Sequence, residues 1–399
     1  MRLRYLLVLL TIALASPQVA RAAFPVAEST ALPVSISAFD RAPGVALDGL
    51  GNSVVVWNRL SPGSQVVARR FDPQGHTLGR LLVVTANGSL PTAAMNSHGD
   101  FAVAWFDAGS PKPSRGYPMH VQLFSPGGAK VGPTTLLNTS VGEQTTAPRI
   151  GVDQDGGFAV TWSSVKGVYV RRFDSKGVPR GNDVLTVPGG YYSSLAMRPD
   201  GGFTLVWQAS QLMGRRFGTD GEADGEDFQI NQQAASGMRT STAATTADGG
   251  FVVAWDVCGT APRGASKPPR GVAVCGIRAR RFDAGARPLT DEFAVSPADG
   301  RSNQGPVVAA EDGHGYFAVT WNSCLQVNNC QIATQLYSPQ SAPAPHVATA
   351  AIGSGSASPA IAVGPDGFVV AFSSSVCNSF FPSCRQSAPK GIYTWRFDF

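Results

Sequence analysis

Hydrophobic residues recur along this chain in short blocks whose two faces are both apolar. In "FVVAW", Phe251 to Trp255, every residue is apolar, whichever side of an extended strand it occupies. Successive strand residues point to opposite faces, so the block predicts a strand that is buried on both sides. Similar blocks occur seven times, and they end at Trp57, Trp105, Trp162, Trp207, Trp255, Trp321 and Phe372.

A second landmark follows each block and makes it part of a longer repeat. It is an aromatic residue, often within "RRFD", at Phe71, Phe124, Phe173, Phe217, Phe282, Tyr337 and Phe397. Aspartate and glycine stand before each block and after most landmarks, as expected of tight turns between strands. Each unit therefore predicts four strands joined by a DGG turn, a variable loop and a second glycine turn.

Sheets that are apolar on both faces must be covered on both sides, and packing around an axis provides that cover. The repeat therefore predicts an all-β fold, a seven-bladed β-propeller of four-stranded antiparallel blades. The approximate units are 42–89, 90–145, 146–191, 192–237, 238–302, 303–356 and 357–399. The last unit lacks a fourth strand, so we expect residues 31–37 to complete it and close the ring.

The final residues allow one competing interpretation. In "YTWRFDF", Tyr393 to Phe399, aromatic and polar residues alternate, as they do in a lipid-facing strand of an outer-membrane barrel. We favour the propeller because the repeated apolar blocks lack the polar face that a water-filled barrel requires.

Residues 1–22 have the composition of a secretory signal peptide. Arg2 and Arg4 precede an apolar run, and small residues stand just before Ala23. We therefore expect one exported domain over residues 23–399, extracellular or periplasmic, without a membrane span. The charge of +5 falls to +2 without the three arginines of residues 1–22, which gives no electrostatic reason to expect nucleic acid as a partner.

Six cysteines in an exported chain suggest disulfides, and the repeat chooses among the pairings. Cys258 and Cys275 occupy the same positions of their unit as Cys324 and Cys330 do in the next. We predict that each pair closes the loop between the second and third strands. Cys377 and Cys384 are expected to do the same in the last unit.

The sequence contains none of the familiar catalytic motifs, such as HExxH or GxSxG. "DGEADGED", Asp220 to Asp227, partly matches a calcium loop, but Asn231 stands where the bidentate glutamate belongs. No catalytic residue or metal site is assigned, and no cofactor is expected, with calcium as the alternative.

Candidate binding residues fall in the long loops, which the topology places on one face. Loops on a rigid scaffold commonly carry recognition, and these loops hold basic and aromatic side chains. The candidates are Arg115, Tyr117, Arg263, Lys267, Arg270, Phe380 and Phe381. Their basicity favours an anionic glycan or an anionic protein surface as the partner. We expect the protein to be a monomer.

The "DGGFVVAW" and "ARRFD" phrases resemble the repeats of bacterial exported proteins, adhesin-like or calcium-binding and largely uncharacterised. The resemblance covers nearly the whole predicted mature chain, although units two and six have "LFSPGG" and "LYSPQS" in place of RRFD. The regular repeats, with irregular loops on one side, favour a non-enzymatic binding or adhesion-type propeller. A secreted carbohydrate-active hydrolase or lyase with a central-channel site, and a structural envelope protein, are the alternatives. Charged residues converging on the axis would favour the enzyme, and small apolar walls would favour binding.

Overall fold

The computed structural model describes eighteen stretches of the chain. These are residues 32–35, 37, 40–61, 63–108, 117–138, 145–233, 237, 240–259, 274–296, 302–309, 315–326, 329–338, 340–341, 343, 348–353, 359–364, 367–374 and 391–398, with single residues counted as stretches. The predicted signal peptide, residues 1–22, lies outside them.

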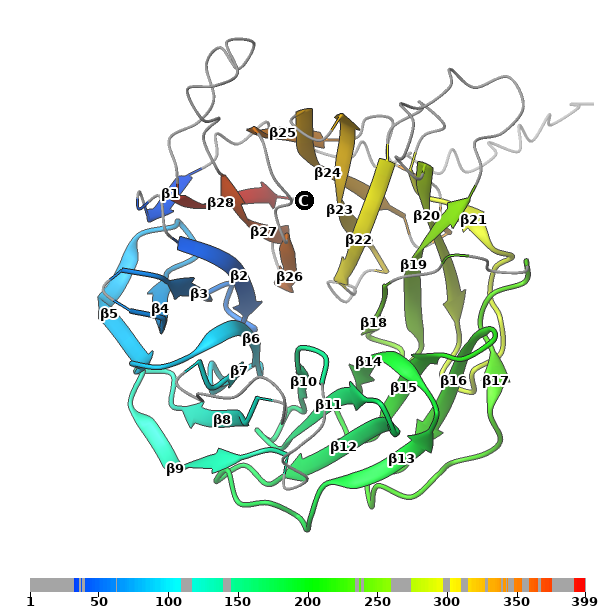
Figure 1. The fold of residues 1–399 in the computed structure, drawn as a ribbon, viewed down its shortest axis with the longest axis horizontal. Coiled ribbons are helices and arrows are strands. Elements are labelled where there is room, and N and C mark those ends of the chain that lie inside the picture. The colour runs from blue at the N-terminus through cyan, green and yellow to red at the C-terminus, as the bar shows by residue number, and fades with distance from the viewer. Residues whose placement is uncertain are drawn as a thin grey trace, which may run out of the picture.

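The described strands form seven four-stranded antiparallel sheets, here numbered sheets 1 to 7 (Figure 1). Sheet 1 holds β2 (Asp40–Leu47), β3 (Ser53–Arg59), β4 (Gln65–Phe71) and β5 (Thr77–Thr85). Sheet 2 holds β6 (Ser89–Met95), β7 (Phe101–Phe106), β8 (Met119–Phe124) and β9 (Lys130–Leu136). Sheet 3 holds β10 (Arg149–Val152), β11 (Phe158–Ser164), β12 (Gly167–Phe173) and β13 (Val184–Pro188).

Sheets 4 to 7 repeat this order. Sheet 4 holds β14 (Tyr191–Met197), β15 (Phe203–Gln208), β16 (Leu212–Phe217) and β17 (Phe228–Gln229). Sheet 5 holds β18 (Ser241–Thr245), β19 (Phe251–Gly259), β20 (Val274–Phe282) and β21 (Phe293–Ala294). Sheet 6 holds β22 (Ser302–Ala309), β23 (Phe317–Gln326), β24 (Asn329–Tyr337) and β25 (Ala348–Gly353). Sheet 7 holds β26 (Ala360–Gly364), β27 (Gly367–Ser374), β28 (Gly391–Asp398) and β1 (Leu32–Ser35).

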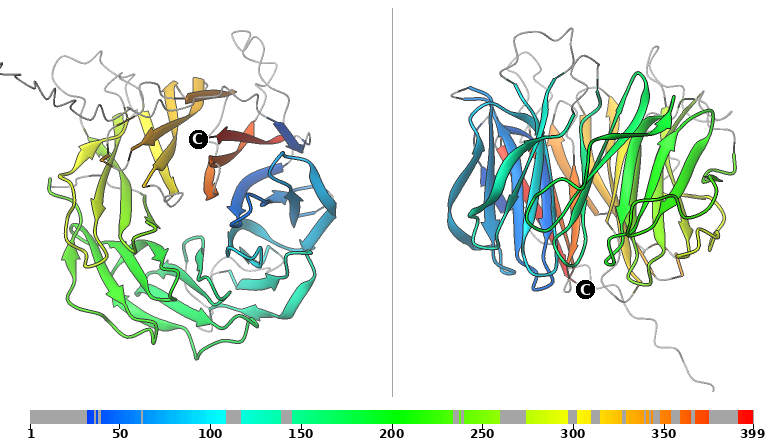
Figure 2. Two further views of the ribbon diagram at one scale, coloured as in Figure 1. Left: turned by 180° about the vertical axis from the view of Figure 1, so that it is seen from behind. Right: turned by 90° about the horizontal axis from the view of Figure 1, so that it is seen from below.

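The sheets stand around a common axis with their first strands innermost (Figures 1 and 2). Each innermost strand contacts the next along the series β2, β6, β10, β14, β18, β22 and β26, and β26 contacts β2. Within sheet 7, β1 pairs with β28, and Leu32 lies opposite Thr394. The prediction of an all-β propeller of four-stranded antiparallel blades is confirmed.

The hydrophobic core lies between the sheets. Each of seven clusters of buried residues combines one face of a sheet with the facing side of a neighbour. The cluster between sheets 7 and 1, for example, joins Val369 and Ala371 to Val55 and Trp57. Burial on both faces explains why strands such as β19 carry no polar side.

The recurring phenylalanines form cross-strand pairs inside the sheets. Phe158 of β11 lies opposite Phe173 of β12, and their rings stack with centroids 4.5 Å apart. Phe251 and Phe282 repeat the arrangement at 4.9 Å in sheet 5. Such pairs contribute more than their buried area alone, which accounts for one phenylalanine in each half of the repeat.

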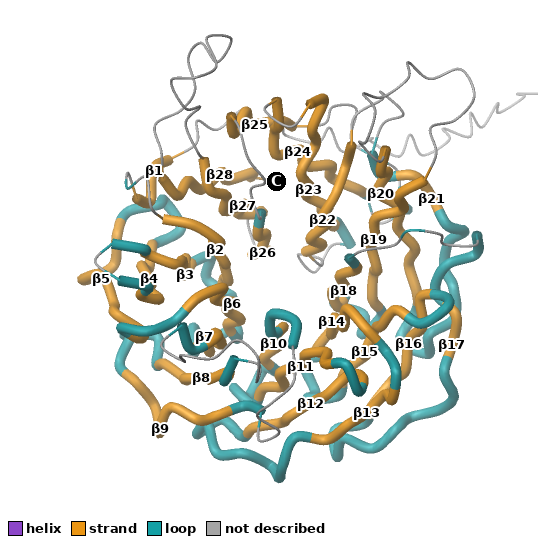
Figure 3. Tube along the Cα trace, in the orientation of Figure 1, coloured by secondary structure: helices purple, strands orange, loops and turns teal. Residues whose placement is uncertain are grey.

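The DGG turns have the predicted chemistry. The Asp248 carboxylate accepts a hydrogen bond of 3.0 Å from the Gly250 amide, and Gly249 between them has φ of +80°. An L side chain rarely adopts that φ, which is why glycine stands there. Figure 3 shows these turns as short loops between long strands.

The first arginine of the "RRFD" phrase reaches back to the outer part of the preceding sheet. Arg69 donates to the Val34 carbonyl at 3.1 Å, and Arg280 donates to the Ile230 carbonyl at 2.9 Å. In sheet 2 the same position is Gln122, which donates instead to Val131 of its own sheet at 3.0 Å. The arginine therefore joins neighbouring sheets, and the shorter glutamine does not.

The second arginine reaches forward to the next sheet. Arg70 donates to the Pro126 carbonyl at 2.5 Å, and Arg172 donates to the carbonyls of Thr219 and Asp220. The guanidinium of Arg281 lies 5.6 Å from the centre of the Phe317 ring in sheet 6. The pair thus connects a sheet to both of its neighbours.

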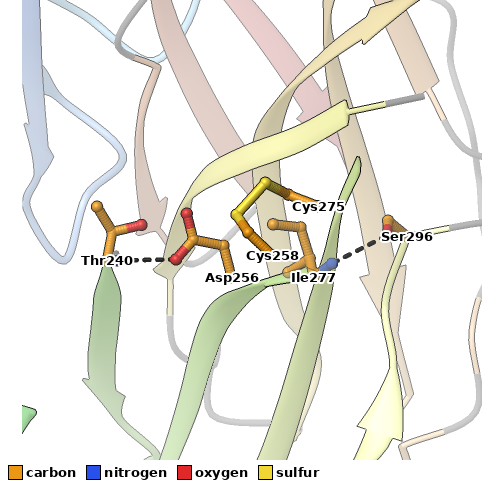
Figure 4. Close-up of a disulfide and its surroundings, with 6 residues drawn as sticks. All are labelled: Thr240, Asp256, Cys258, Cys275, Ile277 and Ser296. Carbon is orange, nitrogen blue, oxygen red and sulfur yellow. Dashed lines mark hydrogen bonds between the residues drawn. A yellow bond between two sulfur atoms is a disulfide. The ribbon is translucent and has the colours of Figure 1, made fainter. Parts of the chain in front are cut away.

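Two of the predicted disulfides are present. Cys258 of β19 is bonded to Cys275, which lies opposite it on β20 (Figure 4). Cys324 of β23 is bonded in the same way to Cys330 of β24. The predicted pair Cys377 and Cys384 lies outside the described residues. Two disulfides fit an oxidising compartment such as the periplasm or the exterior. Among the described residues, no helix has the length and apolarity needed to cross a membrane.

Candidate functional site

The two faces of the propeller differ in their connections. One face carries the DGG and glycine turns, and on the other the innermost strands begin and the second strand connects to the third. We call the latter the loop face. Six of the seven predicted binding residues lie outside the described residues, namely Arg115, Arg263, Lys267, Arg270, Phe380 and Phe381.

Tyr117 is the one predicted binding residue that the structure describes. Its side chain packs edge-on against Phe106, with ring centroids 6.0 Å apart, and the residue keeps 39% of its surface exposed. The Asn138 amide donates to the Tyr117 carbonyl at 3.2 Å. Tyr117 is therefore fixed at the loop face and remains open to a partner.

A pocket of about 390 Å³ opens at the centre of the loop face, where the innermost strands begin. Six of the seven innermost strands contribute to it. Its walls consist of Ala42, Pro43, Gly44, Val45, Leu90, Pro91, Thr92, Ala93, Ala147, Pro148, Arg149, Thr240, Thr242, Gly305, Asn322, Pro359, Ala360 and Ile361. A volume of this size is typical of a site for a small molecule or a terminal group.

The rim of this pocket has strained backbone. Ala42 and Leu90, which line it, each have φ of 49° and lie where the pairing of the innermost strand shifts register. Tyr192 of β14, outside the lining, has φ of 50° at the corresponding shift. Left-handed backbone at a residue other than glycine costs about 1 kcal/mol or more. Proline follows both Ala42 and Leu90. Because proline has no amide hydrogen, the bulge leaves no backbone N–H without a hydrogen-bond partner at that position.

Arg149 is the one charged residue among those that line this pocket. Its side chain is reached by solvent yet surrounded by the innermost strands, and this enclosure lowers the pKa of the guanidinium. Within the part of the chain that the structure describes, it has neither a hydrogen bond nor an ion pair. Thr240 lines the same pocket, and among the described residues its hydroxyl also has no partner. The Arg149 guanidinium can therefore bind a ligand that enters the pocket, whereas the Thr240 hydroxyl is buried in its wall.

Below the mouth, the channel is lined by small and apolar residues. A hollow of about 280 Å³ is bounded by alanines, valines, Gly151, Leu195 and Met197, among others, with Thr245 as the polar member. The Thr245 hydroxyl donates to the Met197 carbonyl at 2.6 Å. No carboxylate is among the residues lining the mouth or this hollow.

The opposite face holds a charged cleft of about 120 Å³ between sheets 3 and 4. Burial raises the pKa of Asp153 there, although the amides of Gly157 and Asp155 act against the change. Arg172 lines the cleft with its guanidinium already engaged by backbone carbonyls. The cleft thus serves the junction between two sheets.

The acidic segment that partly matches a calcium loop pairs with arginines. Asp227 accepts from Arg215 at 3.0 Å, and Asp224 accepts from Arg216. Asn231, which interrupts the motif, accepts from the Leu212 amide at 2.8 Å. Within the described ranges, no cluster of three histidine, cysteine, aspartate or glutamate residues could hold a metal ion.

Comparison with known proteins identifies the fold. No protein-family description matches the chain, and neither does any curated protein. Hydrazine synthase of Kuenenia stuttgartiensis is similar in structure, with 11% identity over 96% of this chain and 99% of that one and a TM-score of 0.53. A protein of unknown function from Dyadobacter fermentans matches 82% of this chain and 98% of its own, at 12% identity and a TM-score of 0.48. At these identities the similarity supports the propeller fold alone.

The pocket lies on the face where the sequence predicted the binding loops, but its lining residues were not among the candidates. Arg149, Leu90 and Tyr192 were not among the predicted binding residues. The sequence does contain a signal for this region. A dipeptide that ends in proline lies at or near the start of five innermost strands. Examples are Ala42-Pro43, Leu90-Pro91, Ala147-Pro148, Gly305-Pro306 and Ser358-Pro359.

Proposed function

We propose that this chain is an exported, closed seven-bladed propeller that binds a glycan or protein surface at its loop face without transforming it. The observation that carries the proposal is the pocket at the channel mouth. It combines apolar walls, an unpaired guanidinium and a strained rim on the face that also bears the long loops. Strained backbone that the surrounding fold maintains is a common feature of binding sites.

The closed ring gives this face its rigidity. Its support is the set of seven inter-sheet clusters, the pairing of β1 with β28, and the bond from Arg69 to Val34 across sheets 1 and 7. A rigid scaffold lowers the entropy cost of binding, because the contact groups are already in place. The resemblance to exported repeat proteins, some of them adhesin-like, is compatible with this class of binder. We further propose that the chain acts as a monomer and without a cofactor.

The test is a screen of purified protein against glycans, envelope polymers and secreted proteins, with products assayed for every species that binds. A loop-face variant, Tyr117→Ala with Tyr191→Ala, is compared with Leu50→Ala on the opposite face. Tyr191 is 49% exposed and Leu50 is 73% exposed, so these substitutions create no internal cavity. A third variant replaces Phe380 and Phe381 with alanine.

We expect saturable binding without product, weakened by the loop-face variants and unchanged by Leu50→Ala. Turnover of a bound glycan would overturn the proposal in favour of a carbohydrate-active hydrolase or lyase. Absence of saturable binding to every species would leave a structural envelope role. Equal loss of binding in Leu50→Ala would show that the loop face is not the contact surface.

A further inference from the structure

We propose that the pocket at the mouth of the central channel captures the carboxyl-terminal residue of a polypeptide, with Arg149 binding the terminal carboxylate. The inference rests on the proposed function and deepens it, because it names the group that enters the channel. It follows from the charge, size and surface chemistry of the pocket.

The charge of the pocket calls for one anion. Arg149 provides five N–H donors in a planar fork that matches the two oxygens of a carboxylate. Arg149 lines the pocket, is reached by solvent and has no partner among the described residues, so its guanidinium can bind a carboxylate that enters the mouth. Among the described residues, none of those lining the pocket carries a carboxylate that could neutralise Arg149 from within.

The size of the pocket limits what can enter. A space of about 390 Å³ accommodates one or two residues at the end of a chain, whereas a folded surface cannot enter it. The strained bulges at Ala42 and Leu90, each followed by proline, hold the mouth in a fixed form. A narrow, rigid opening on the axis of the ring therefore favours a chain end over an internal loop.

The walls decide between a peptide and a sugar acid. A sugar acid carries several hydroxyls, each of which requires a hydrogen-bond partner when it leaves water. The pocket offers mainly proline, alanine, Val45, Leu90 and Ile361, and its neutral polar residues are Thr92, Thr240, Thr242 and Asn322. A terminal residue with an apolar side chain needs one cationic partner and apolar contact, and the pocket provides both.

The experiment uses fluorescein-labelled pentapeptide pools that vary in the last residue, prepared with a free carboxylate and with a carboxamide at the end. Binding to the full mature chain is measured by fluorescence anisotropy. Arg149→Gln removes the charge, and Arg149→Lys keeps the charge but loses the fork. Arg287→Gln is the matched control, because Arg287 is an exposed arginine of the opposite face. Thermal unfolding confirms that each variant is folded.

We expect the free-carboxylate pools with apolar last residues to bind, and amidation to weaken binding about tenfold or more. Arg149→Gln should weaken binding of the free-carboxylate pools by the same factor as amidation does. The variant should therefore bind free and amidated pools equally well, while Arg149→Lys should keep part of the preference for the free carboxylate. Arg287→Gln should change neither. Equal binding of free and amidated pools, or an advantage that survives Arg149→Gln, would overturn the inference.

Two further outcomes separate this inference from the proposed function. Binding of an oligouronate, lost in Arg149→Gln, without binding of any peptide pool would reject the peptide and retain the loop-face binder. Binding found in the wider screen that is indifferent to Arg149 would reject the channel mouth as the site. If no species binds saturably in either experiment, both the inference and the proposed function fail.

Discussion

Replacing Arg280 with methionine removes a guanidinium that joins sheet 5 to sheet 4. Its Nη1 donates to the Ile230 carbonyl at 2.9 Å, and its Nε donates to the Thr290 carbonyl at 3.1 Å. The guanidinium also lies 5.4 Å from the centre of the Phe282 ring, and the residue is 8% exposed. Methionine fills a similar volume and can make neither hydrogen bond.

The expected loss of stability follows from these contacts. A hydrogen bond from a charged donor contributes about 1.5 to 3 kcal/mol, and a contact with an aromatic face about 0.5 to 1 kcal/mol. The loss is partly offset, because the wild-type protein must desolvate the guanidinium on folding and methionine carries no charge to desolvate. We therefore expect Arg280→Met to lower the free energy of unfolding by about 2 to 3 kcal/mol. For a chain of this length the Tm should fall by about 3 to 4 °C.

Calorimetry at pH 7 measures the change, and hydrogen exchange locates it. Amide exchange should accelerate in β17 and β20, where the two sheets meet, more than in sheets 1 and 2. Arg280→Gln should give a smaller loss, since glutamine stands at this position in sheets 2 and 6. Arg287→Gln, on an exposed turn, should change stability by less than about 0.5 kcal/mol. An Arg280→Met protein as stable as the wild type would refute the assignment of an inter-sheet role.

Three other predictions follow from single sites. Ala286 has φ of +62° where related turns have glycine, so Ala286→Gly should raise stability by about 0.5 to 1 kcal/mol in chemical denaturation, and a decrease would contradict the strain. The buried Asp40 carboxylate accepts a hydrogen bond from the Trp57 indole at 2.8 Å, so Asp40→Ala should lower the free energy of unfolding by about 2 kcal/mol. Hydrogen exchange should accelerate mainly in β1, and an equal acceleration in all sheets would contradict this prediction. The Thr246 hydroxyl, at 2.6 Å, lowers the pKa of Asp248 against the opposing effect of burial. Its folded pKa is below the unfolded value, so the stabilisation is present above about pH 4 and disappears as the pH falls through the folded pKa. The Tm difference between wild type and Asp248→Asn should therefore shrink from pH 7 to pH 2, and a constant difference would argue against it.

The repeat made the main features of the fold predictable. Apolar blocks such as Phe251 to Trp255 specify strands buried on both faces, and aspartate with glycine specifies the turns between them. These are local relations, because side-chain direction and turn geometry depend on neighbouring residues. Equivalent positions in successive units also identified the pairs Cys258 with Cys275 and Cys324 with Cys330, since residues at matching repeat positions occupy matching places in the sheets.

The candidate site was not predictable in the same way. Arg149 stands at the start of an ordinary strand. The Ala147-Pro148 dipeptide before it marks where that strand begins, and does not show that Arg149 will meet Ala42, Leu90, Thr240 and Gly305 around one axis. The direction in which Arg280 reaches, and the strain at Leu90 and Tyr192, likewise depend on the neighbouring sheets. The sequence alone therefore determined the strands, their turns and their order, because these depend on local periodicity. Only the tertiary structure decided which side chains meet at the channel mouth, because that meeting depends on closing residues far apart in the chain around a common centre.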